Sequence, residues 1–204
     1  MLLYDCPNPA PNPRRVRMFL AEKGLSLPTK VLALRNGEHK APEFLAINPM
    51  GQIPALVLDD GAVITESIAI CRYLEAEHPE PPLFGTDGRS MAQIDMMLRR
   101  VELRFVTPLA MIWMHTHPFT AQVVKPQYRE FGESNRSRVA SVLREFEAVL
   151  AAHPFLAGDD YSIADIALYS ALEFATLVEV ALSDDLPNLK AWHARCAARP
   201  SGAA

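Results

Sequence analysis

The stretch NPMGQIPALVLDDGAVITESIAICRYL, residues 48–74, contains the patterns that decide the fold of the first part of the chain. Ile53-Pro54 opens an apolar run, Ala55–Leu58, which is typical of a strand. Asp60-Gly61 is a strong turn signal, and a second apolar run follows over Ala62–Ile64. This segment therefore predicts a β-hairpin, and the periodic sequence after it predicts a helix.

The start of that helix carries side chains that match the head group of an amino acid. Thr65 suits a helix N-cap, which places Glu66 and Ser67 in the first turn. Free backbone N–H groups and the positive end of the helix dipole favour a bound carboxylate there. The Ser67 hydroxyl can donate to that carboxylate, and Glu66 can accept from an ammonium group. A cis bond before Pro54 would also free the N–H and C=O of Ile53 for an extended peptide. We therefore expect a site for a small peptide-like anion.

Composition excludes several other classes of protein. The chain has 204 residues, half of them hydrophobic, which is enough for one large or two small cores. A net charge of −4 and a sequence pI near 5.9 argue against a nucleic-acid surface. The basic pairs Arg14-Arg15 and Arg99-Arg100 lie within helical patterns and are interpreted as solvated helix faces.

Neither a membrane segment nor a metal site is expected. The first residues lack the order of a secretory signal, and no apolar stretch reaches 18 residues, so a cytoplasmic protein is predicted. The cysteines Cys6, Cys71 and Cys196 lie far apart and lack the spacing of metal ligands. Neither a disulfide framework nor a zinc site is therefore predicted.

The first eighty or so residues alternate strand and helix signals, as in a βαβ unit followed by a hairpin and a helix. Besides the hairpin, the expected elements are a strand over Leu2–Tyr4, a helix over Pro13–Lys23, a strand over Val31–Leu34, a short helix over Pro42–Ile47 and a helix over Thr65–Glu77.

The remainder of the chain has helical periodicity throughout. Pro108 should bend or end one helix, and residues 117–133 are expected to form a long connection. Ser162 and Asp165 fit a capping box, and a last helix is expected over Pro187–Ala198. Prolines and glycines mark a linker before these helices. The predicted organisation is a domain over 1–77, a linker over 78–88 and an all-helical domain over 89–204.

The order Ile-Pro, hairpin, Glu-Ser in residues 48–74 resembles the glutathione-binding half of the cytosolic glutathione S-transferases, and the resemblance covers nearly the whole chain. It implies an α/β thioredoxin-like N-terminal domain, an all-α helical-bundle C-terminal domain, a homodimer, and glutathione as co-substrate without a metal. The glutathione-binding residues that it implies are His39, Gln52, Ile53, Pro54, Glu66 and Ser67. Lys40 is a further candidate beside His39, and the second substrate is expected near Met111, Trp113, Met114 and His115.

The residue that faces the glutathione sulfur is the unusual part of the resemblance. The family places a Tyr, Ser or Cys before its first helix, whereas the serine position here falls on Pro11. Ala10-Pro11-Asn12 is similar to the Asn-containing pattern of the nu-class enzymes and of a fungal transferase-like nitrogen regulator. That similarity implies that Asn12, with backbone N–H groups of the helix start, contacts the sulfur. Two alternatives remain: Asn12 as a simple N-cap before Pro13, and Cys6 as the nucleophile.

The predicted function is that of a glutathione S-transferase that stabilises the glutathione thiolate and directs it at a disulfide or at an apolar electrophile. The nu-class pattern favours disulfide reduction. The alternative is a glutathione-binding regulatory or scaffold protein with little catalysis. For the predicted enzyme, the partners are glutathione and a small electrophilic or disulfide substrate.

Overall fold

The computed structural model describes residues 1–204, which form two compact units. The N-terminal unit comprises Met1–Leu83 together with Arg199–Ala204, and the helical unit comprises Phe84–Ala198. The unit boundary falls inside the stretch that we interpret as a linker. The C-terminal end differs from the prediction, because residues 199–204 belong to the N-terminal unit rather than to the helical one.

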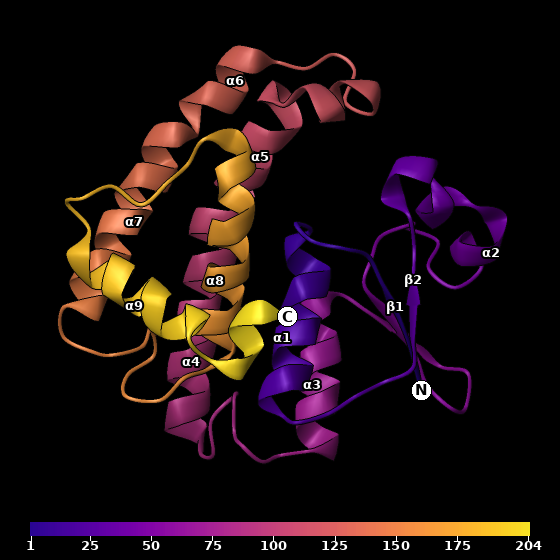
Figure 1. Cartoon of the computed structure of the whole chain (residues 1–204), viewed down its shortest axis with the longest axis horizontal. Helices are drawn as coiled ribbons and strands as arrows, with labels where there is room; N and C mark the ends of the chain where they lie inside the picture. Colours follow the sequence, from indigo (N-terminus) through magenta and orange to yellow (C-terminus); the bar gives the residue numbers. More distant parts are fainter. The chain divides into compact units, whose positions relative to one another are not determined.

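The N-terminal unit is a small mixed sheet with helices on both faces (Figure 1). Its strands have the order β2-β1-β3-β4; β1 and β2 are parallel, and the other neighbours are antiparallel. Helices α1 and α3 lie on one side of the strands and α2 on the other, which is a thioredoxin-like arrangement. The elements are β1 (Leu2–Asp5), α1 (Pro11–Glu22), β2 (Thr29–Val31), α2 (Pro42–Leu45), β3 (Ala55–Val57), β4 (Val63–Thr65) and α3 (Ser67–Glu77), with 3₁₀ turns at Leu34–Asn36, Glu38–Lys40 and Pro200–Ala203.

Alternation along β1 explains how both faces of the sheet are covered. Successive side chains of a strand point to opposite faces. Tyr4 packs with Phe44 of α2, their ring centroids 5.4 Å apart, whereas its neighbour Leu3 is almost fully buried. The second strand differs from the prediction of Val31–Leu34: it ends at Val31, opposite Asp5, where β1 also ends.

The helical unit is built around α8 (Ile163–Ala175), which is buried over most of its length. Its N-terminus confirms the predicted capping box of Ser162 and Asp165. The other helices are α4 (Gly88–Arg100), α5 (Thr107–Thr116), α6 (Arg129–Ser134), α7 (Arg136–Leu150) and α9 (Pro187–Ala197), with a π-helical segment at Val101–Val106 and 3₁₀ turns at Pro118–Gln122 and Thr176–Val178.

Pro108 does not end its helix. Instead, a π-helical segment joins α4 to α5, and the backbone N–H of Thr107 reaches the carbonyl of Glu102. The Thr107 hydroxyl donates to the same carbonyl at 2.9 Å. A widened turn of this kind accommodates a residue that lacks an N–H group. The expected connection over 117–133 is also more ordered than predicted, because it contains a 3₁₀ turn and the start of α6.

The last residues of the chain pack on α1. Arg199 and the Ser201 hydroxyl both donate to the Glu22 carboxylate, and Arg199 does so with Nε at 2.9 Å and Nη2 at 2.7 Å. Arg14 donates from Nη2 to the Gly202 carbonyl at 2.9 Å and from Nε to the Ala204 carbonyl at 3.1 Å. Arg14-Arg15 is therefore not the solvated face that we expected, because the two side chains are buried.

Replacing Glu22 by glutamine should weaken this attachment in a pH-dependent way. Burial alone would raise the pKa of Glu22, but hydrogen bonds from Arg199 and Ser201 and the Arg199 charge hold it below its ordinary value. Its stabilisation is therefore present above the unfolded pKa of about 4.3 and is lost as the pH falls through the folded value. We expect E22Q to lose about 1–2 kcal/mol at pH 7.

Urea unfolding of E22Q and the wild-type protein at pH 7 and near pH 3 measures this effect. The difference between the two proteins should shrink at the lower pH. Glu43→Gln is the matched control, because Glu43 is exposed on α2 and should be neutral at both pH values. A difference that is equal at both pH values would contradict the assignment to the Glu22 charge.

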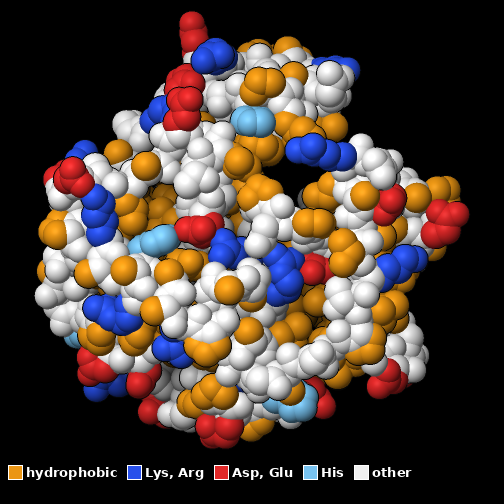
Figure 2. Space-filling model, in the orientation of Figure 1, with side chains coloured by type: hydrophobic (Ala, Val, Ile, Leu, Met, Phe, Trp, Pro, Cys, Tyr) orange, Lys and Arg blue, Asp and Glu red, His pale blue; other side chains and the backbone are white.

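Three features of the structure concern its possible partners: the surface charges, the apolarity of the helices and the grouping of potential metal ligands. Basic and acidic side chains are interspersed with apolar ones over the face shown in Figure 2. None of the helices combines the length and the apolarity that crossing a membrane requires. No three His, Cys, Asp or Glu side chains are grouped so that they could hold a metal ion.

Candidate functional site

A cavity of about 360 Å³ in the N-terminal unit collects residues from separate parts of the sequence. They come from the start of α1, the loop before α2, the loop before β3 and the start of α3. All the residues predicted to contact glutathione, as well as Asn12, line this one cavity. The lining residues are Cys6, Ala10, Pro11, Asn12, Pro13, Leu34, His39, Lys40, Asn48, Gly51, Gln52, Ile53, Pro54, Glu66 and Ser67.

The start of α1 presents fewer backbone donors than the sequence suggested. Ala10 is the N-cap and the helix begins at Pro11, so Asn12 lies in the first turn rather than at the predicted N-cap. The flanking residues Pro11 and Pro13 have no N–H group, and the N–H of Arg14 already reaches the Ala10 carbonyl at 3.3 Å. Within the first turn, Asn12 is therefore the main donor, through its backbone N–H and its exposed side-chain amide.

The start of α3 also differs by one residue from the prediction. Thr65 ends β4, Glu66 is the N-cap, and the helix begins at Ser67. Glu66 has a φ of 65°, which is uncommon for a residue with a side chain. Such a conformation costs about 1–3 kcal/mol and is concentrated at functional sites. The turn leaves Glu66 exposed and Ser67 buried, both at the cavity.

A compact loop holds the residues before β3. Asn48 Nδ2 donates to the Gln52 carbonyl at 2.7 Å, and its Oδ1 accepts from the Met50 N–H at 3.2 Å. Gly51 has a φ of 58°, and a Cβ there would lie 2.7 Å from Lys40 Nζ and 2.8 Å from the His39 carbonyl oxygen. Only glycine fits this position, so Gly51 is what allows the two lining loops to approach each other.

The residues predicted to bind the far end of a peptide lie on these loops. Lys40 Nζ donates to the Met50 carbonyl at 3.0 Å, which uses one of its three N–H groups. Burial and, secondarily, the charge of Lys40 lower the pKa of His39, so its imidazole is neutral at pH 7. His39 Nδ1 is buried and has no partner within the chain. Gln52 is exposed.

The Ile53-Pro54 step has a cis peptide bond and lines the cavity. Neither the N–H nor the C=O of Ile53 is hydrogen-bonded within the chain. An N–H and a C=O that are both free on the loop before β3 are what an added extended segment would pair with.

Cys6 lines the cavity but is a poor nucleophile. Only 1% of its surface is exposed. Burial and then the charge of Asp5 raise the pKa of its thiol to about 11, although Arg17 opposes them. A thiolate is the reactive form, so this cysteine is inert at neutral pH.

Replacing Cys6 by alanine should therefore change glutathione-dependent kcat/KM by less than about twofold, because a buried protonated thiol contributes no negative charge. Steady-state kinetics and a melting curve on the same preparation check this. A loss of tenfold or more in a protein that keeps its melting temperature would contradict the assignment and return Cys6 to the list of nucleophiles.

The residues expected to bind the second substrate do not share one face of α5. Trp113 packs edge-on against Phe174 of α8, with ring centroids 5.0 Å apart, and stacks on His117 at 4.0 Å. His115 instead contacts Phe131 of α6, with centroids 5.3 Å apart. The Met111 carbonyl lies on the His115 side, since both face Gly132. Sequence spacing of two residues places side chains on opposite helix faces.

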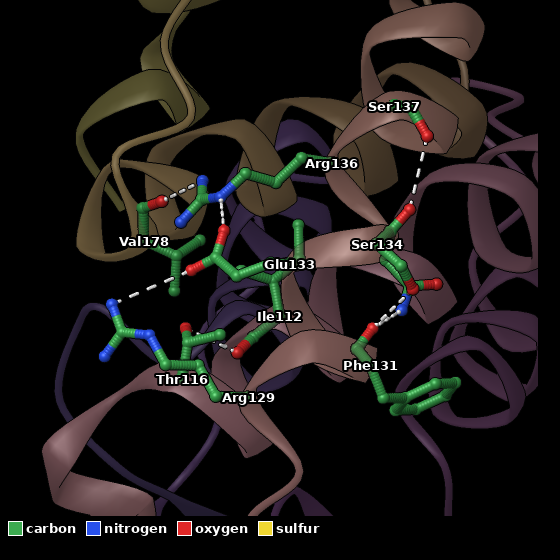
Figure 3. Close-up of polar contacts among 10 residues, drawn as sticks. Ile112, Thr116, Arg129, Phe131, Glu133, Ser134, Arg136, Ser137 and Val178 are labelled. Carbon is green, nitrogen blue, oxygen red and sulfur yellow. Dashed lines mark hydrogen bonds and ion pairs between the residues drawn. The ribbon is translucent and has the colours of Figure 1, made fainter.

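Polar contacts fix α6 in this position (Figure 3). Arg136 Nη1 donates to the Val178 carbonyl at 2.8 Å, and the same guanidinium pairs with Glu133. Asn135 Nδ2 and the Ser134 hydroxyl both donate to the Phe131 carbonyl at 2.7 Å. Gly132 permits the close approach, because a Cβ there would lie 2.7 Å from Thr116 Cγ2.

Comparison with known proteins agrees with this architecture. Family models for the glutathione S-transferase N-terminal and C-terminal domains match residues 10–77 and 110–200. The chain is 38% identical to glutathione S-transferase 2 of Saccharomyces cerevisiae, covering 98% of this chain and 87% of that protein. It is 37% identical to glutathione S-transferase 3 of Zea mays, covering 98% and 90%. The crystal structure of Gtt2 from Saccharomyces cerevisiae superposes with a TM-score of 0.92 at 38% identity, covering 98% of each chain. The chain belongs to the glutathione S-transferase family.

Proposed function

We propose that the chain binds glutathione in the cavity of the N-terminal unit, stabilises its thiolate mainly through Asn12, and directs the thiolate at a disulfide or an apolar electrophile. The observation that carries the proposal is the composition of this one cavity. It combines an exposed carboxylate, a buried hydroxyl, an unpaired peptide group and an exposed amide. Glutathione offers a complementary ammonium, carboxylate, peptide backbone and thiol.

The γ-glutamyl end of glutathione is assigned to the start of α3. Glu66 accepts from the ammonium group, and the Ser67 hydroxyl and the free N–H groups of the first turn donate to the carboxylate. The first backbone bond of this helix runs from the Ile70 N–H to the Glu66 carbonyl at 3.0 Å. The earlier N–H groups of the turn therefore have no intrahelical acceptor.

The rest of the peptide is assigned along the neighbouring loops. The free N–H and C=O of Ile53, held by Pro54, pair with the cysteinyl backbone as a short added strand. Lys40, the neutral His39 and Gln52 then bind the glycine carboxylate. Of these, only Lys40 supplies a full positive charge, so it contributes the largest part of the attraction.

The thiol is assigned to Asn12 at the start of α1. A free thiol has a pKa of about 8.5, and each unit by which the pKa falls corresponds to about 1.4 kcal/mol of preference for the thiolate. One amide donor and the positive end of α1 supply a shift of roughly one to two units.

Because Cys6 is protonated, the bound glutathione is itself the nucleophile. With a disulfide, its thiolate attacks one sulfur, forms a mixed disulfide and expels the other sulfur as a thiolate. A second glutathione then releases the remaining thiol and leaves oxidised glutathione. With an apolar electrophile, the same thiolate forms a thioether and displaces a leaving group.

The second substrate is assigned near Met111, Trp113, Met114 and His115 of α5, where Met114 has the most exposed side chain. A homodimer that works in the cytoplasm is part of the proposal. Sedimentation at micromolar concentration tests the dimer, and a monomer would count against it.

The proposal is tested by kinetics on purified protein with glutathione and two acceptors, hydroxyethyl disulfide and a chloro-aromatic compound. Disulfide reduction predicts the larger kcat/KM with the first, and conjugation predicts the larger kcat/KM with the second. Calorimetric titration with glutathione alone measures binding independently of either reaction.

A regulatory or scaffold protein that binds glutathione without turnover is the second candidate. Pro11 at the serine position of the family and the buried Cys6 favour it. Retained glutathione binding with negligible turnover of both acceptors would support this candidate over the enzyme.

A further inference from the structure

Arg15 is a buried cation directly behind the glutathione cavity. Arg15 lies on α1 and is only 2% exposed. Its Nη1 lies 2.9 Å from the Ser67 hydroxyl oxygen. The functional assignments above make no use of it. What links Arg15 to the cavity is this hydrogen bond to Ser67, a residue that lines it.

The direction of this hydrogen bond is fixed by chemistry. A guanidinium group has N–H donors and no acceptor, so the Ser67 oxygen must accept. The single hydroxyl proton of Ser67 therefore cannot point at Arg15. The Ser67 hydroxyl donates to no acceptor within the chain. Ser67 is 5% exposed, and it lines the cavity. The proton is available to an acceptor in the cavity.

We propose that Arg15 is a positioning residue that fixes the Ser67 hydroxyl as a hydrogen-bond donor aimed at the γ-glutamyl carboxylate of glutathione. The inference rests on the proposed function and deepens it. A free serine hydroxyl can rotate and can donate or accept equally well. With Arg15 behind it, Ser67 meets an anion with its proton already in place, which lowers the ordering cost of binding.

The surroundings of Arg15 agree with a fixed orientation. Arg15 also acts electrostatically on Cys71, which lies one turn after Ser67 on α3. Burial raises the pKa of the Cys71 thiol, and the charge of Arg15 opposes that rise. The guanidinium is thus held between α1 and the first turns of α3. Its positive charge next to the Ser67 oxygen polarises the hydroxyl, which strengthens the hydrogen bond that Ser67 donates.

A double-mutant cycle tests the role of Arg15. The variants are Arg15→Met, Ser67→Ala and the two combined, with glutathione affinity measured by calorimetry and KM and kcat by steady-state kinetics. We expect Arg15→Met to raise Kd and KM for glutathione about tenfold and to leave kcat within twofold. Such a change removes binding that is equal in the ground and transition states. In the Ser67→Ala background, the same change should alter Kd by less than twofold.

A merely structural role predicts a different result. It would give an equal loss of affinity with and without Ser67, or a fall in kcat, and either result would overturn the proposal. If Arg15→Met fails to fold, Arg15→Lys carries the same cycle, because it retains the buried charge. The shorter reach of lysine should still weaken glutathione binding severalfold when Ser67 is present and by less than twofold when it is absent.

Arg14→Met is the matched control. Arg14 is the neighbouring buried arginine, but its guanidinium donates to the carbonyls of Gly202 and Ala204. It should lower the unfolding midpoint and leave Kd for glutathione unchanged. Wild-type protein that does not bind glutathione would overturn the proposed function and the inference together. Additive losses in a protein that does bind glutathione would overturn only the role of Arg15.

Discussion

Replacing Asn12 by alanine should lower kcat/KM for every glutathione-dependent reaction of this protein by about 10- to 100-fold. The change removes the side-chain donor in the first turn of α1, where prolines occupy the two neighbouring positions. Hydrogen bonds to charged groups contribute about 1.5–3 kcal/mol, which corresponds to that range of rates. Steady-state kinetics with hydroxyethyl disulfide and with a chloro-aromatic acceptor measure the effect.

The pH dependence separates a thiolate contact from a general structural effect. Loss of a donor to the thiolate should raise the pKa of bound glutathione, so the rising limb of kcat/KM against pH should move upward by about one unit. Asn12→Asp has the same shape, but it offers acceptors and a negative charge, and should be slower than Asn12→Ala. Full turnover of Asn12→Ala with both acceptors would show that the sulfur is stabilised elsewhere.

The part of the site formed by local sequence was predictable. The hairpin and the following helix lie within one or two residues of the expected positions, since Asp60-Gly61 and the apolar runs are short-range signals. The residues flanking that hairpin also converge on one cavity with His39 and Asn12. Only the family resemblance could predict this convergence. It depends on the pairing of β1 with both β2 and β3, and such long-range pairing cannot be inferred from local sequence patterns.

The residues that were missed act through packing between distant segments. The sequence pattern of α1 favours a surface charge at Arg15, because it does not reveal that α3 covers this side chain. The importance of Gly51 depends on the approach of Lys40, which no local pattern encodes. Likewise, the docking of residues 199–204 on Arg14 and Glu22 depends on tertiary contacts, so periodicity alone assigned them to the helical domain.

The helix caps show the same limit on a smaller scale. Both Asn12 and Thr65 are good N-cap residue types, yet Ala10 and Glu66 occupy the caps of α1 and α3. The tertiary position of each turn overrides residue preference there. For α1 the consequence is functional, because Asn12 lies at the cavity instead of capping its own helix.

Replacing Asp165 by alanine should destabilise the helical unit more than any other substitution considered for it. The carboxylate is fully buried and accepts from the N–H groups of Leu156 and Ser162, at 2.9 and 3.0 Å, and from Trp192 Nε1 at 2.8 Å. Alanine would leave these buried donors without an acceptor. At about 1–3 kcal/mol for each such group, we expect a loss of about 3–5 kcal/mol. Thermal and urea unfolding should show it as a fall in Tm of about 10 °C.

Two further variants separate hydrogen bonding from packing. Asp165→Asn keeps the shape of the side chain. In the native protein each carboxylate oxygen accepts two hydrogen bonds, so the amide nitrogen of asparagine would face hydrogen-bond donors in either orientation. It should therefore lose at least about 2 kcal/mol. Asp159→Ala is the matched surface control, since its side chain is 88% exposed, and should change stability by less than about 0.5 kcal/mol.

Burial raises the pKa of Asp165 even though backbone and side-chain donors from Leu156, Trp192 and Ser162 oppose that rise. The hydrogen bonds to Asp165 therefore offset the cost of removing its carboxylate from water. They also join the loop at Leu156, the start of α8 and the Trp192 indole of α9. If Asp165→Asn were as stable as the wild-type protein, this network would not be what holds α9 to α8, and the apolar contacts of the fully buried Trp192 would have to account for it.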